Sequence, residues 1–220
     1  MKIKVKYSLN REIDSYLNSL YRFRWFKHGR SDIQERLLKP FPDDFKNSLK
    51  RAKNEAEARK VIKKFRLENI KKTRESYSRV AKILEERWGK EGDSIIKKLE
   101  DIYGKKLPFP ELTVYLQSIP ICPYNYKEKW IMMFANTDVS QQLRIIIHEL
   151  NHFMFYYHFP NLKEELGKEK YEILKEALAI YSNPEGNDKP SVKKLETYFK
   201  KHLDKSIPEV LSLGELKDYL

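Results

Sequence analysis

Apolar side chains recur three or four residues apart over most of the chain, and this spacing predicts a mainly helical protein. The longest such stretch runs from Asp43 to Trp88 without a single Gly or Pro. Its apolar pattern weakens between Asn69 and Ser76, so we predict a break or a hairpin there. Gly89 and Gly92 follow the stretch and are expected to end the helix, because glycine is common just past a helix C-terminus.

Three shorter stretches have the pattern of β-strands. Ile3, Val5 and Tyr7 alternate with lysines, and residues 112–116 and 130–134 are clusters of apolar residues. Between the last two stretches, prolines at 120 and 123 predict a loop. The expected fold class is therefore α+β, mostly helical, with a small mixed sheet.

A boundary is expected near Pro108 and Pro110, after a helix that Gly104 closes. It divides the chain into a basic, mainly helical N-terminal region, residues 1–104, and a second domain, residues 105–220. The 44 Lys and Arg outnumber the 32 Asp and Glu, which gives a net charge of +12 and raises nucleic acid as a partner. The basic residues are spread among glutamates, however, and this favours an ordinary solvated surface.

The cysteine count and the apolar runs bear on the compartment. The single cysteine, Cys122, excludes an intramolecular disulfide and is expected to be a packed residue. The first residues lack the apolar segment of a signal peptide, and no run is long enough to span a membrane. We therefore expect a soluble, cytoplasmic protein without a membrane partner. The oligomeric state is left open.

The chemistry of the chain centres on His148, Glu149 and His152. Positions four apart lie on the same face of a helix, so both imidazoles can reach one metal ion. Glu149 lies at the edge of that face, where it can contact a water held by the metal. A helix is expected here, because Asp138 is a good N-cap and no Gly or Pro follows before Phe159.

A catalytic zinc ion takes three protein ligands and leaves one position open. The next predicted helix, residues 171–181, carries Glu172 and Glu176 one turn apart. Glu176 flanks the apolar face of that helix and is the favoured third ligand. Glu172 lies further toward solvent and is the alternative ligand, or a residue that orients a histidine.

The two histidines, Glu149 and the segment Glu176 to Tyr181 resemble the gluzincin clan of zinc metallopeptidases, over roughly residues 107–185. The gap from His152 to Glu176 is a few residues longer than in thermolysin-like members, whereas Glu172 matches their gap. The resemblance implies a zincin-like catalytic subdomain with Zn²⁺ as the cofactor, a peptide or protein substrate, and Glu149 as the general base. It also implies that the strand before the metal helix forms the rim of the cleft, where residues about 132–136 would pair with an extended substrate backbone. An ordinary core or edge strand is the equally open alternative for these residues.

Gluzincins usually stabilise the oxyanion with a Tyr or a His, and four residues here are candidates for this role: Tyr157, His158, Tyr181 and His202. Two other functions remain as alternatives. The chain could be a zincin-fold binding module without activity, or a protein that binds nucleic acid through its basic helical half.

Overall fold

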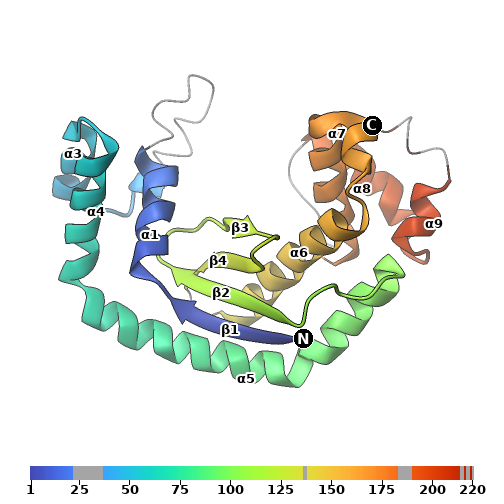
Figure 1. Cartoon of the computed structure of the whole chain (residues 1–220), viewed down its shortest axis with the longest axis horizontal. Coiled ribbons are helices and arrows are strands. Elements are labelled where there is room, and N and C mark those ends of the chain that lie inside the picture. Colours follow the sequence, from blue (N-terminus) through green and yellow to red (C-terminus); the bar gives the residue numbers. More distant parts are fainter. Residues whose placement is uncertain (22–36, 136–137, 183–189, 214–215, 217–218, 220) are drawn as a thin grey trace.

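The computed structural model describes residues 1–21, 37–135, 138–182, 190–213, 216 and 219. It is an α+β fold in which helices predominate, as the sequence predicts. The long helix α5 runs beneath the sheet, with α1, α3 and α4 at one end of the molecule and α7, α8 and α9 at the other (Figure 1). None of the helices in the described ranges is both long enough and apolar enough to cross a membrane.

The described strands form one four-stranded sheet in the order β1-β2-β4-β3. The first three are parallel, and β3 is antiparallel to β4. Their bounds are Lys2–Tyr7 for β1, Glu111–Gln117 for β2, Tyr124–Asn125 for β3 and Trp130–Phe134 for β4. β1, β2 and β4 lie in the three stretches that the apolar pattern singled out.

β3 falls in the stretch that the prolines predicted to be a loop. It is only two residues long, and it covers the outer side of β4 where Tyr124 pairs with Ile131 and Asn125 pairs with Trp130. β4 is consequently an interior strand, and Ile131, Met132 and Met133 are buried. The amide of Met132 donates to the carbonyl of Pro123 at 2.7 Å. That residues about 132–136 pair with a substrate stays a prediction, and residue 136 lies outside the described residues.

The N-terminal half contains four described helical elements before the long helix. α1 is followed directly by a π-helical turn, η1, and α3 and α4 pack against both in a core of their own. Their bounds are Leu9–Tyr16 for α1, Leu17–Tyr21 for η1, Asp43–Arg51 for α3 and Glu55–Glu68 for α4. The break between α3 and α4 was not predicted. After it, Asn54 accepts the Glu57 amide and caps α4.

Helix α5, Ile70–Tyr103, begins after Asn69, which confirms the predicted break in the apolar pattern. It then continues through Gly89 and Gly92, so the prediction that these glycines end a helix is wrong. Gly92 leaves room for the neighbouring indole, because a Cβ there would lie 2.5 Å from Nε1 of Trp88. Gly104 ends the helix in the left-handed conformation, at φ 57°, as predicted.

The C-terminal half contains α6, Val139–His158, α7, Leu162–Leu178, and the short 3₁₀ turn η3, Ala179–Tyr181. Two further helices follow, α8, Pro190–Lys200, and α9, Ile207–Leu211. The first half of α6 packs on the sheet and α5, and its second half joins a separate core with α7, α8 and α9. α6 thus connects the two cores of this half.

The sheet and its core contain residues from both sides of position 104. β1 pairs with β2 from Lys2 opposite Glu111 to Tyr7 opposite Leu116. The same core cluster joins Ile3 and Leu84 to the side chains of the later strands and of α6. Residues 1–104 therefore supply an edge strand and a packing helix to the sheet.

A buried ion pair joins the N-terminal helices to the end of the sheet. The carboxylate of Glu12 is fully buried and accepts hydrogen bonds from Nε of Arg66 at 2.9 Å and from the hydroxyl of Tyr7 at 2.9 Å. Its other oxygen accepts the amide of Ser118 at 2.9 Å and the hydroxyl of the same residue at 2.7 Å. One carboxylate thereby links β1, α1, α4 and the segment after β2.

Candidate metal centre

Helix α6 positions the two histidines. Asp138 caps it by accepting the amide of Gln141 at 3.0 Å, as the sequence predicts. Leu150 and Phe153 fix its rotation by packing into the core of the sheet. The rings of His148 and His152 then lie one turn apart, with their centroids 4.3 Å apart. His152 is buried and His148 is half-buried, so the pair lies where the surface meets the interior.

Helix α7 brings a carboxylate to these rings. The helix packs on α6 through Phe155 and Tyr171, whose ring centroids are 4.7 Å apart, and through the fully buried Ala177. Oε1 of Glu176 lies 3.7 Å from Nε2 of His152. One ligand atom from each of His148, His152 and Glu176 falls within 4.8 Å of the other two.

This donor set fits a divalent metal ion. Two imidazoles and one carboxylate are the ligands of many catalytic zinc sites, in which the fourth position is left for water or substrate. In the described part of the chain, these three side chains form the group of His, Cys, Asp or Glu that is close enough to share an ion. The residues present therefore fit the cofactor that the sequence predicts.

Glu172 lies outside this group. Its side chain is 40% exposed, and its Oε2 lies 2.9 Å from Nζ of Lys175. The hydroxyl of Tyr156 also donates to this carboxylate, at 3.2 Å. The structure thus brings Glu176 to the histidines, whereas the contacts of Glu172 are with Lys175 and Tyr156.

Glu149 is buried directly beside the cluster. Its side chain is only 6% exposed, and its Oε2 has no hydrogen-bond partner among the described residues. Burial raises the pKa of Glu149 to about 8; nearby Lys175 lowers it and Glu176 raises it. A buried carboxylate oxygen without a partner is costly unless water, an ion or a ligand completes it. Glu149 is therefore a buried carboxyl group beside the cluster, and its pKa lies closer to neutral pH than that of an exposed glutamate.

Sequence reasoning missed Lys175, whose side chain is only 5% exposed. Its ammonium contacts both Glu172 and Glu176, and it donates to the hydroxyls of Tyr124 and Tyr156 at 2.9 Å and 3.3 Å. A signal was present in the sequence. Lys175 lies four residues after Tyr171 and three before Leu178, so it shares the inward face of α7 with these two buried residues.

The four residues that the sequence raised as oxyanion donors make contacts elsewhere. The hydroxyl of Tyr181 donates to the carbonyl of His202 at 3.0 Å, and that of Tyr157 donates to a backbone carbonyl at 3.2 Å. Nε2 of His158 lies 3.0 Å from another backbone carbonyl, and the ring of His202 packs edge-on against Tyr198. The tyrosines that border the candidate centre are instead Tyr124 and Tyr156.

A hollow of about 530 Å³ lies on the side of Glu172, and none of the three cluster residues lines it. Four tyrosines line it, and the rings of Tyr126 and Tyr156 stack with their centroids 4.7 Å apart. Tyr124 lines the hollow and also neighbours His152. The centroids of the Tyr124 and His152 rings are 5.9 Å apart. The ring of Tyr124 therefore lies between the hollow and the histidine and glutamate cluster.

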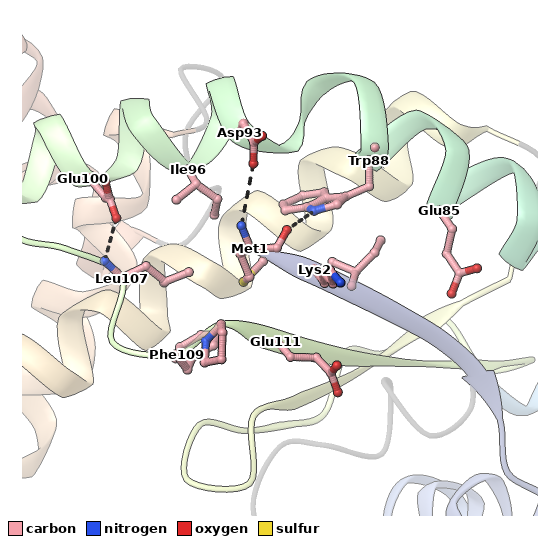
Figure 2. Close-up of a pocket in the computed structure, with 13 residues that line it drawn as sticks. Met1, Lys2, Glu85, Trp88, Asp93, Ile96, Glu100, Leu107, Phe109 and Glu111 are labelled. Atoms are coloured by element: carbon pink, nitrogen blue, oxygen red, sulfur yellow. Dashed lines mark hydrogen bonds and ion pairs between the residues drawn. The ribbon is translucent and has the colours of Figure 1, made fainter.

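A second hollow, of about 820 Å³, lies between β1 and α5 and has several carboxylates in its lining (Figure 2). These carboxylates already have partners. Asp93 faces the amino group of Met1 at 3.7 Å, Glu100 accepts the amide of Leu107 at 3.0 Å, and Glu85 accepts a backbone amide of β1 at 2.7 Å. Its contacts hold β1 against α5, and its carboxylates do not form a metal-binding group.

Comparisons with known proteins add no relative to this picture: the chain matches no family model, no curated protein and no solved structure. Any functional conclusion consequently depends on the geometry and chemistry of the residues themselves.

Proposed function

We propose that this protein is a zinc-dependent peptidase of the gluzincin type, with His148, His152 and Glu176 as the metal ligands. One observation carries the proposal: these three side chains, two on one helix and one on the next, bring their ligand atoms within 4.8 Å of one another. The spacing of the two histidines on a single helix face, with a glutamate directly after the first, supports it independently.

Each residue then has a defined part in the hydrolysis of a peptide bond. Zinc, when bound, would activate a water molecule and polarise the scissile carbonyl. Glu149 would accept a proton from the attacking water and return it to the leaving amine, a role that its place directly after His148 and its burial beside the cluster support. The tyrosine-lined hollow would offer space for a side chain of the substrate.

The proposal is tested by the variant Glu149→Gln. The amide has nearly the same shape but cannot accept the proton, so we expect zinc binding to be retained and hydrolysis to fall about 10²- to 10⁴-fold. The measurements are zinc content by elemental analysis and cleavage of a fluorogenic peptide library. Glu165→Gln, at an exposed position of α7, is the matched control and should leave both unchanged.

Two results would contradict the proposal. Full activity of Glu149→Gln would remove Glu149 as the base. One equivalent of bound zinc without cleavage of any peptide would instead favour a binding module that keeps the metal centre but not the activity.

A further inference from the structure

Lys175 is a buried cation whose four polar contacts all belong to the proposed metal centre or its border. Its Nζ lies 2.9 Å from the hydroxyl of Tyr124, 2.9 Å from Oε2 of Glu172, 3.2 Å from Oε1 of Glu176 and 3.3 Å from the hydroxyl of Tyr156. An ammonium group is rarely buried unless it is paired, because removing it from water is costly. The site therefore includes a permanent positive charge.

One oxygen atom is shared between this charge and the proposed ligand set. Oε1 of Glu176 lies 3.2 Å from Nζ of Lys175 and 3.7 Å from Nε2 of His152. The carboxylate oxygen that faces His152 is thus also the one that pairs with the ammonium.

We propose that Lys175 is a built-in counterion of this centre, which neutralises Glu176 when no divalent cation is bound and competes with that cation for the same carboxylate. The inference rests on the proposed metal centre and extends it to the regulation of metal affinity. Glu172, Tyr124 and Tyr156 give the ammonium other partners to keep when the cation takes Glu176.

Two effects of Lys175 on metal affinity oppose each other. A group that orients a ligand typically raises affinity, and its loss costs about 10- to 100-fold. An ammonium group that shares a carboxylate oxygen with a divalent metal ion lowers the metal affinity of the site. The two positive groups repel each other, and this repulsion is weakly screened because the ammonium is buried. Here α7 already orients Glu176 through the fully buried Leu174 and Ala177 on either side of it. The repulsion should therefore prevail.

The test compares Lys175→Met with Lys170→Met, which makes the same chemical change at an exposed position of α7. Each protein is stripped with a chelator, and its zinc affinity is measured by competition with a chromophoric chelator. We expect Lys175→Met to bind zinc about tenfold more tightly or better, since the repulsion is gone. Lys170→Met should match the unchanged protein. Equal or weaker zinc binding by Lys175→Met would overturn the proposal.

Thermal unfolding gives a second readout. Without metal, Lys175→Met should melt at a lower temperature than the unchanged protein, because it leaves neighbouring carboxylates without their counterion. Excess zinc should close or reverse that gap, since a ligand stabilises the state that binds it more tightly. A gap of the same size with and without zinc would show an ordinary packing role and contradict the proposal.

A milder variant decides the question if Lys175→Met fails to fold. Tyr124→Phe keeps the ring beside His152 but removes the hydroxyl that accepts from the ammonium. Lys175 should then hold Glu176 more strongly, so zinc should bind several-fold more weakly. Tyr126→Phe, which removes a hydroxyl from the same hollow, is the control and should leave zinc affinity unchanged. Unchanged or tighter binding by Tyr124→Phe would overturn the proposal.

The results separate this inference from the peptidase proposal. Tighter zinc binding by Lys175→Met in a protein that cleaves no peptide supports the counterion and contradicts the enzyme. Unchanged zinc binding by Lys175→Met in a protein that cleaves peptides supports the enzyme and contradicts the counterion. A protein that binds no zinc with His148 and His152 intact contradicts both.

Discussion

Glu172 and Glu176 lie one turn apart on the same helix, and both contact Lys175, but they differ in their contact with the histidines. Glu176 reaches the ring of His152, whereas Glu172 is held at the surface by Lys175 and Tyr156. If this geometry defines the ligand set, Glu176→Ala should weaken zinc binding at least about a hundredfold, since it removes a direct ligand. Glu172→Gln should change it by less than about tenfold, because only a neighbouring charge is lost. Equilibrium dialysis with zinc measures both.

The reverse order of the two effects would make Glu172 the ligand and would require α7 to turn on its axis. The reciprocal control is His158→Ala, which removes an imidazole at the C-terminal end of the same α6 helix, outside the cluster. It should leave zinc affinity unchanged.

Single residues also show where sequence reasoning reaches its limit. The positions of His148, His152 and Glu176 on helix faces follow from spacing alone, and the structure brings the three together. The contacts of Lys175 with Tyr124 and Tyr156 do not follow from spacing, because β3, α6 and α7 contribute one residue each. A lysine in a sequence is also normally predicted to be exposed to solvent. The burial of Lys175 therefore follows only from the packing of the helices in the structure.

At the scale of elements, helix α5 contains one close contact that requires a glycine. Gly92 makes space for the indole of Trp88, which donates from Nε1 to the carbonyl of Met1 at 3.1 Å. Gly92→Ala should destabilise the protein by about 1–3 kcal/mol, because overpacking outweighs the better helix propensity of alanine. Gly89→Ala should instead be neutral or stabilise by up to about 1 kcal/mol, since nothing lies within 4 Å of the added Cβ.

Urea unfolding of both glycine variants measures this difference. Equal effects of the two substitutions would mean that the indole can move aside at little cost.

The ion pair between Glu12 and Arg66 fixes α4 to α1 and to the end of the sheet. Arg66→Met should cost about 3–5 kcal/mol, because it leaves a fully buried carboxylate without its counterion. The double variant with Glu12→Gln should cost clearly less than the sum of the two single changes. A double-mutant cycle from urea unfolding measures the coupling, and strictly additive effects would show that the pair is not coupled.

Most elements could be predicted because their apolar positions have a clear period. Glycine misled the prediction at Gly89 and Gly92, since the propensity cost of about 1 kcal/mol each is offset by packing that sequence does not show. β3 was missed because two residues are too few to carry an alternating pattern. The break before α4 is marked by one capping side chain, Asn54, in a stretch without Gly or Pro.

For the whole molecule, the sheet makes the two halves of the chain depend on each other. A fragment of residues 105–220 lacks β1 and α5, and it would expose the faces of β2 and α6 that pack against Ile3 and Leu84. We expect this fragment to show no cooperative thermal transition by circular dichroism, because too little apolar surface stays buried. The control is the same measurement on a mixture of this fragment with residues 1–104 as a separate chain. A cooperative transition of the fragment alone would contradict the expectation.

The pairing of β1 with β2 also sets the order in which the protein can fold on the ribosome. Ile3 lies opposite Leu112, so the first strand leaves the exit tunnel more than a hundred residues before its partner. At translation rates of about 5–20 residues per second, that interval lasts roughly 5–20 s. The nascent chain must therefore carry its first strand unpaired while the long helix α5 is completed, and sheet formation has to wait for the later half of synthesis.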